Sequence, residues 1–166
     1  LYTTEDVEST LGLLDPVPYD ADLDLGDGIT ARLTRAGHIL GSASVTVWTP
    51  TTSVVFSGDI GRATHPVLRP REVPPGGAYV LVESTYGDRT HPSAPNLPHE
   101  GFADVVRRTI ERGGSVLVLA FAIDRTELVL QTLGEFMRHG RIPEVPVWVN
   151  SPMATAVVGV YESMPT

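Results

Sequence analysis

The sequence contains no cysteine, no lysine and no long hydrophobic run. Without cysteine, disulfide scaffolds and thiolate metal sites are excluded, so any bound metal must be held by histidine and carboxylate side chains. No apolar stretch approaches the roughly 18 residues of a membrane-spanning helix, and no basic segment followed by an apolar one opens the chain. We therefore expect a cytoplasmic protein that has no membrane partner.

Basic side chains are few as well. The 12 basic residues are all arginine and face 20 aspartate and glutamate residues, which gives a formal net charge of −8. An acidic chain does not bind nucleic acid through bulk charge, so a polyanion would have to be held at a local site. With 166 residues, 42% of them hydrophobic and 19% charged, the chain has the composition of one globular domain or of parts of two.

The first half of the chain predicts a short helix and then strands. Thr3 and the acids after it are typical of a helix start, and the apolar residues that follow recur at helical spacing as far as Leu14. The pattern then changes to short β-type runs with glycine and proline turns between them. These runs cover residues 21–25, 29–35, 43–49 and 53–56. They predict a meander of mostly antiparallel strands.

The second half predicts alternating strands and helices. A proline-rich stretch over residues 62–77 is the best candidate for an internal boundary. After it, strands are expected at residues 79–82, 115–119 and 145–149, and helices at residues 99–112, at 125–138 and from Pro152 onward. Because strands that alternate with helices pair in parallel through crossovers, the expected fold class is α/β.

Three side chains are candidates for chemistry. His38 lies between two glycines in the link that joins two expected strands, where the backbone can bend sharply and approach a ligand. Asp59 follows an apolar strand and is also flanked by glycines, which leaves room for an ion. Glu83 follows an apolar strand directly, in a position where a carboxylate needs a partner.

Each of these residues also has an ordinary structural interpretation: a surface histidine, an aspartate that closes a turn, and a glutamate that faces solvent. Taken together, one imidazole and two carboxylates fit a hydrolytic zinc site. They do not complete one, because a catalytic zinc needs about three protein ligands and a water.

Four segments of the chain carry a family resemblance: residues 36–43, 56–62, 83–89 and 151–154. In their order and spacing they resemble the β-CASP branch of the metallo-β-lactamase superfamily. That branch includes RNase J and the endonuclease subunit of the cleavage and polyadenylation specificity factor. The resemblance implies part of an αββα metallo-β-lactamase sandwich over residues 1–77. It further implies a connection over residues 78–95 and part of an inserted β-CASP α/β domain over residues 96–166.

Carried over by position, the resemblance implies that His38 and Asp59 are metal ligands, with Asp59 bridging two zinc ions and therefore also catalytic. Glu83 falls on the first β-CASP motif and would orient groups of the active site; a glutamate here resembles the RNA-processing members. Residues 121–128 resemble the segment that opens a helix in the family, with Asp124 in place of the usual glycine. Aspartate is also a good N-cap residue, so we expect Asp124 to cap that helix. No substrate-binding residue is identified.

One family motif is missing. The His-x-His-x-Asp-His motif, which carries most of the zinc ligands in the family, does not occur, and the remaining histidines are too scattered to replace it. They are His65, His91, His99 and His139. The chain also opens at Leu1 rather than at a methionine. We interpret it as an internal fragment of a longer enzyme, and we expect the fragment alone to be inactive and a poor zinc binder.

The resemblance implies that the complete protein is a zinc-dependent RNA-processing nuclease that hydrolyses phosphodiester bonds by a two-metal mechanism. RNA would be its substrate and two Zn²⁺ ions its cofactors. The choice between exonuclease and endonuclease action stays open, and so does a homodimer. Two alternatives also stay open: a metallo-β-lactamase-type hydrolase of a small substrate, and a catalytically inactive scaffold homologue.

Overall fold

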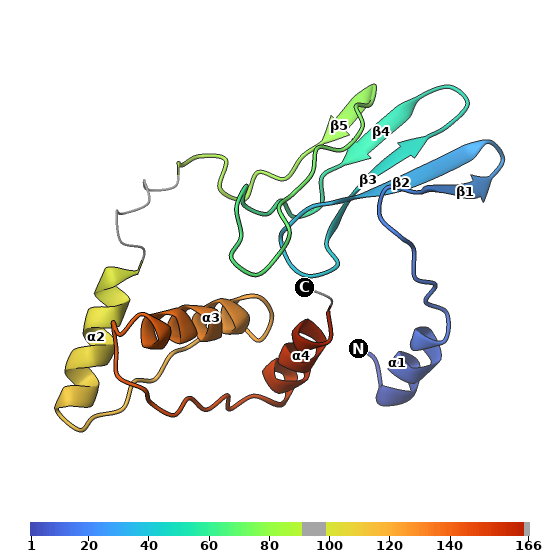
Figure 1. Cartoon of the computed structure of the whole chain (residues 1–166). Coiled ribbons are helices and arrows are strands. Elements are labelled where there is room, and N and C mark those ends of the chain that lie inside the picture. The colour runs from blue at the N-terminus through green and yellow to red at the C-terminus, as the bar shows by residue number, and fades with distance from the viewer. Residues whose placement is uncertain (91–98, 165–166) are drawn as a thin grey trace. The chain divides into compact units, whose positions relative to one another are not determined.

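The computed structural model of this chain describes residues 1–90 and 99–164. His91 and the expected boundary between residues 95 and 96 lie outside these ranges. The described residues form two compact units, the first made of residues 1–63 and 70–83 and the second of residues 64–69 and those from 84 onward. The fold is mixed α/β, with the strands in the first unit (Figure 1). No helix in the described ranges combines the length and the apolar character needed to cross a bilayer.

The first unit is built on a five-stranded sheet with the strands in chain order (Figure 1). The strands are β1 (Asp22–Gly26), β2 (Ile29–Arg35), β3 (Ala43–Trp48), β4 (Ser53–Phe56) and β5 (Tyr79–Leu81). β1 to β4 form an antiparallel meander, which confirms the prediction, and β5 adds parallel to β4. The parallel pair is possible because residues 57–78 connect the two strands. This connection is long enough for the chain to return from the end of β4 to the level at which β4 began.

One face of this sheet is lined by small and hydroxyl-bearing side chains. Thr34 lies opposite Ser44, and Thr46 lies opposite Val55; all four are buried. A proline-glycine segment of the same unit lies against them: the Thr46 hydroxyl donates to the Pro75 carbonyl oxygen over 3.5 Å. Short side chains on the strands allow this backbone to approach closely.

Helix α1 (Thr4–Leu11) has the predicted N-terminal cap. The Thr3 hydroxyl accepts from the Asp6 backbone nitrogen, and the Asp6 carboxylate accepts from the Thr3 backbone nitrogen, so a full capping box is present. The helix buries none of its residues, and Leu11 is 60% exposed. Its apolar side chains are therefore not part of the core of the first unit, as far as that unit is described.

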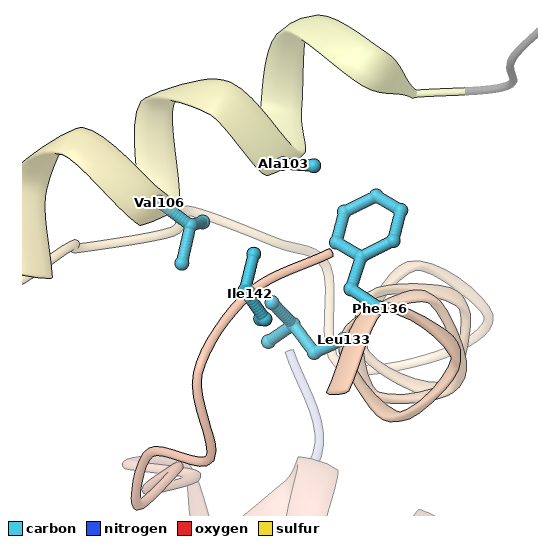
Figure 2. Close-up of a cluster of buried hydrophobic side chains, with 5 residues drawn as sticks. All are labelled: Ala103, Val106, Leu133, Phe136 and Ile142. Atoms are coloured by element: carbon cyan, nitrogen blue, oxygen red, sulfur yellow. The ribbon is translucent and has the colours of Figure 1, made fainter. Parts of the chain in front are cut away.

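The second unit contains helices α2 (Glu100–Glu111), α3 (Arg125–Arg138) and α4 (Pro152–Glu162). α4 starts as expected, with Pro152 in its first turn and the Ser151 hydroxyl accepting from a backbone nitrogen. The core of the unit joins α2 to α3. Figure 2 shows side chains from both helices pointing toward one another, together with one from the segment after α3. The cluster consists of Ala103, Val106, Leu133, Phe136 and Ile142.

The expectation of strands at residues 115–119 and 145–149 is wrong for this structure, because neither segment belongs to a strand. Their large apolar side chains are exposed, with Leu119 at 89% and Trp148 at 81%. A strand requires a neighbour that supplies backbone hydrogen bonds, and no described segment pairs with either run. Within the described residues, parallel pairing is confined to β4 and β5.

Candidate metal and catalytic site

Three loops of the first unit meet at one edge of the sheet. β2 ends and β3 begins at this edge, since Arg35 lies opposite Ala43. β4 and β5 both end there, since Phe56 lies opposite Leu81. The three loops cover residues 36–42, 57–61 and 82–83. They carry His38, Asp59 and Glu83, so the sheet brings together residues that are far apart in the sequence.

His38 and Asp59 lie side by side at this edge. His38 Nε2 is 3.8 Å from Asp59 Oδ2, and the two side chains are 47% and 77% exposed. Two ligands of one tetrahedral zinc ion lie about 3.3 Å apart, so this spacing suits donors that share a cation. Within the described residues, no group of three or more histidine, cysteine, aspartate or glutamate side chains is placed to hold a metal. The donor set therefore fits zinc as part of a site.

Glu83 is hydrogen-bonded to the loop that carries Asp59. Its Oε1 accepts a hydrogen bond from the Ile60 backbone nitrogen at 2.9 Å. Its own backbone nitrogen donates to Ser57 Oγ at 3.0 Å. Because hydrogen bonds to a carboxylate are stronger than neutral ones, Glu83 is well placed to hold the loop that presents Asp59.

A second serine holds the loop of His38. Ser42 Oγ accepts hydrogen bonds from the backbone nitrogens of His38, at 3.0 Å, and of Ile39, at 3.2 Å. The Tyr19 hydroxyl donates to the Ser42 carbonyl oxygen at 3.0 Å. Burial raises the pKa of Tyr19. A tyrosine hydroxyl is in any case protonated, and therefore a donor, at neutral pH.

Two glycines allow the loops to approach each other. The Gly61 nitrogen donates to the Ala36 carbonyl oxygen at 2.9 Å. A Cβ atom added to Gly61 would lie 2.6 Å from the His38 nitrogen and closer still to the Gly37 carbonyl oxygen. Gly37 has a φ of +67°, and a Cβ atom there would lie 2.7 Å from the Arg71 nitrogen. A larger residue at Gly61 would push the His38 and Asp59 loops apart, and one at Gly37 would push the His38 loop away from Arg71.

Three residues of the site were not predicted from the sequence: Ser42, Ser57 and Gly61. All three lie inside the segments that carry the family resemblance, and this is the signal that could have pointed to them. Small residues next to a candidate ligand show that backbones come close. They do not show which hydroxyl binds which peptide, because that depends on the register of β3, β4 and β5.

Asp124, in the second unit, has a different role from the one expected. Its side chain does not cap α3 but lies 2.9 Å from Nε2 of His65, whose side chain is 2% exposed. Asp124 has φ +67° and ψ −52°, and the Arg125 nitrogen donates across it to the Ile123 carbonyl oxygen at 2.8 Å. This is a γ-turn of the rare, strained form, which explains why glycine would be at ease here and why a capping geometry is lost.

Of the other histidines, His91 lies outside the described residues, and His65, His99 and His139 belong to the second unit. His65 Nδ1 accepts hydrogen bonds from two backbone nitrogens, those of Val67 and Leu68. His99 and His139 flank helices of the second unit at the N-terminus of α2 and the C-terminus of α3. In the described part of the first unit, His38 lies beside Asp59 at the sheet edge.

No family model matches the chain. It is, however, similar over nearly its whole length to several proteins. A ribonuclease of Thermus thermophilus is 38% identical over 158 residues, which is 95% of this chain and 36% of that protein. An RNase J-like protein of Methanocaldococcus jannaschii is 29% identical over 165 residues, covering 96% of this chain and 39% of that protein. The cleavage and polyadenylation specificity factor subunit 3-I of Arabidopsis thaliana is 28% identical over 165 residues, covering 98% of this chain and 24% of that protein.

The chain belongs to the β-CASP family of the metallo-β-lactamase superfamily. This confirms the family that the four segments predicted. The β-CASP chain described here spans about a quarter to two fifths of the length of these three relatives.

Proposed function

We propose that the complete protein is a zinc-dependent RNA-processing nuclease, and that His38, Asp59 and Glu83 are part of its active site. The observation that carries this proposal is the approach of His38 Nε2 to Asp59 Oδ2, 3.8 Å apart on an exposed sheet edge. Support comes from the relatives reported above, whose names include a ribonuclease, an RNase J-like protein and a cleavage and polyadenylation specificity factor subunit.

In this proposal the His38 imidazole, through Nε2, and the Asp59 carboxylate would help to hold the zinc ions. The ions, when bound, activate a water molecule and stabilise charge on the phosphoryl oxygens. The exposure of both side chains leaves the edge open to a polymer substrate. Two ligands are too few for a catalytic zinc, so further ligands are required from a His-x-His-x-Asp-His motif in the complete protein. For these 166 residues alone we expect no hydrolysis.

Glu83 has an orienting role. By accepting from the Ile60 nitrogen, its carboxylate restrains the loop immediately after Asp59. Removing a group that orients a metal ligand lowers metal affinity or activity by about 10- to 100-fold. A cytoplasmic location and a homodimer remain predictions.

We further infer that the first unit belongs to the metallo-β-lactamase sandwich and that the second belongs to the inserted β-CASP domain. This follows the expected domain order. The inserted domain would supply a surface for a polymer, which a hydrolase of small substrates does not need. The names of the ribonuclease and of the RNase J-like protein likewise favour RNA over a small substrate.

The test is RNA cleavage by the complete protein and by its Asp59→Ala variant, with and without a chelator. We expect at least about a thousandfold loss of turnover in the variant, and loss of wild-type activity when the metal is removed. Asp15→Ala is the control, since Asp15 is an exposed acid of the same unit and belongs to none of the three loops described above. Near wild-type turnover in Asp59→Ala would contradict the assignment.

A further inference from the structure

Ser57 is the residue at which three strands of the sheet are tied together. It follows β4 directly and is 8% exposed. Its backbone nitrogen donates to the Leu81 carbonyl oxygen of β5 at 2.9 Å. Its carbonyl oxygen accepts from the Ser44 hydroxyl of β3 at 2.7 Å. The position of Ser57 is therefore held from both neighbouring strands.

The side chain of Ser57 uses this fixed position to bind two other peptides. Its Oγ accepts from the Glu83 backbone nitrogen at 3.0 Å and donates to the Gly58 carbonyl oxygen at 2.7 Å. A hydroxyl can do both at once because it is a donor and an acceptor. Gly58 has a φ of +56°, and a Cβ atom added to it would lie only 2.9 Å from the Ala43 carbonyl oxygen. Glycine therefore allows the backbone turn that this hydrogen bond requires.

These two bonds reach the backbone on both sides of Asp59. Before Asp59, Ser57 Oγ holds the Gly58 carbonyl oxygen directly. After Asp59, it acts through Glu83: the serine fixes the Glu83 backbone, and the Glu83 carboxylate accepts from the Ile60 nitrogen. A single buried hydroxyl thus anchors both peptides that flank the candidate metal ligand.

From this network we infer that Ser57 is a positioning residue for Asp59 and Glu83. It touches neither metal nor substrate, and it sets the carboxylate of Asp59 in place before either binds. The effect of Ser57 on zinc binding rests on the proposed function. Its effect on the Asp59 loop rests on the hydrogen bonds alone. Removing the hydroxyl would remove one hydrogen bond to a backbone donor and one to a backbone acceptor, each on the loop that carries Asp59 or on the residue that restrains it.

The same strand offers a matched control. Ser53 begins β4, and its Oγ accepts from the Ala78 backbone nitrogen at 3.0 Å, just before β5 begins. Ser53 and Ser57 therefore make the same kind of bond, from a serine hydroxyl of β4 to a backbone nitrogen beside β5, at opposite ends of the strand pair. Ser53→Ala should disturb the pairing of β4 with β5 without reaching Asp59.

The experiment compares Ser57→Ala, Ser57→Thr and Ser53→Ala in the complete protein. Amide hydrogen exchange is followed in the metal-free state, and zinc affinity is measured by competition with a chelator. In Ser57→Ala we expect exchange at the Glu83 and Ile60 amides to be about tenfold faster, and zinc affinity to be about 10- to 100-fold weaker. Ser57→Thr keeps the hydroxyl and should restore most of both. Ser53→Ala should change exchange at Ala78 and leave zinc affinity unchanged.

Two results would overturn the inference. One is wild-type exchange at Glu83 and Ile60 in Ser57→Ala; the other is an equal loss of zinc affinity in Ser53→Ala and Ser57→Ala. Should Ser57→Ala fail to fold, the wild-type protein decides: slow exchange at both amides supports the network, and exchange at the rate of a free peptide refutes it. If the wild type binds no zinc, the proposed function fails, while the exchange data still judge Ser57.

Discussion

Replacing Gly61 with alanine is expected to separate the two loops that carry His38 and Asp59. The added Cβ atom would lie 2.6 Å from the His38 nitrogen, whereas ordinary contacts of this kind are 3.4–4 Å. The neighbouring groups are backbone atoms, so they have no rotamer change available to avoid the clash. The loop would have to retreat, and the hydrogen bond from the Gly61 nitrogen to the Ala36 carbonyl oxygen would lengthen or break.

The size of the effect follows from these two consequences. Overpacking a closely packed site costs about 1–3 kcal/mol, and a lost backbone hydrogen bond adds about 1 kcal/mol. We therefore expect Gly61→Ala to lower the free energy of unfolding of the first unit by about 2–4 kcal/mol. Gly76→Ala is the matched control, because a Cβ atom there meets nothing within 4 Å. It should change stability by less than about 0.5 kcal/mol.

The assay is urea unfolding followed by tryptophan fluorescence. The chain has two tryptophans. Trp48 lies on β3 in the first unit and Trp148 lies in the second, so a Trp148→Phe background makes the signal report on the sheet. If Gly61→Ala unfolds at the same urea concentration as Gly76→Ala, the close crossing of the two loops is not a feature of the folded protein.

Three further predictions concern other parts of the chain. The side chains of His65 and Asp124 are largely buried and lie 2.9 Å apart. A double-mutant cycle of His65→Ala with Asp124→Gly should therefore show a coupling energy of about 1 kcal/mol or more. It is measured by urea unfolding followed through Trp148 fluorescence, and additive effects would contradict the prediction. Glu127 is 6% exposed, and its carboxylate oxygens have no hydrogen-bond partner among the described residues. Glu127→Leu should therefore raise the free energy of unfolding by about 1–4 kcal/mol. A loss of stability would show that the acid is paired. Backbone and side-chain hydrogen bonds from Thr3 lower the pKa of Asp6. The cap of α1 should therefore be fully formed above the unfolded-state pKa of Asp6 and be lost as the pH falls through the lowered folded-state pKa. Circular dichroism that is unchanged by Asp6→Asn would refute this.

The parts of the fold that were predicted are those in which local chemistry decides. The capping box of α1 needs Thr3 and Asp6 at the right spacing, and nothing distant. The strands of the meander follow from apolar runs broken by turn residues, so β2 and β4 were placed with their observed bounds. In such segments the sequence pattern and the folded structure depend on the same few neighbouring residues.

The parts that were missed depend on distant partners. The apolar run at residues 115–119 has strand composition, yet a strand forms only beside another, and the pattern says nothing about its neighbour. Asp124 is a residue type that favours an N-cap, but its carboxylate is hydrogen-bonded to the buried His65 instead. The candidate site shows the same division: the three chemical side chains stand out in the sequence, whereas the hydroxyl of Ser57 acquires its role only when β5 adds beside β4.

The position of bound zinc in the complete protein is the measurement to make. Crystals of the zinc-loaded protein, with anomalous scattering recorded at the zinc edge, would locate each ion relative to the sheet edge. We predict a zinc ion about 2.0–2.2 Å from His38 Nε2 and one at the same distance from a carboxylate oxygen of Asp59, with Glu83 still bound to the Ile60 nitrogen. Zinc that contacts neither His38 nor Asp59 would contradict the assignment of this edge as the metal site.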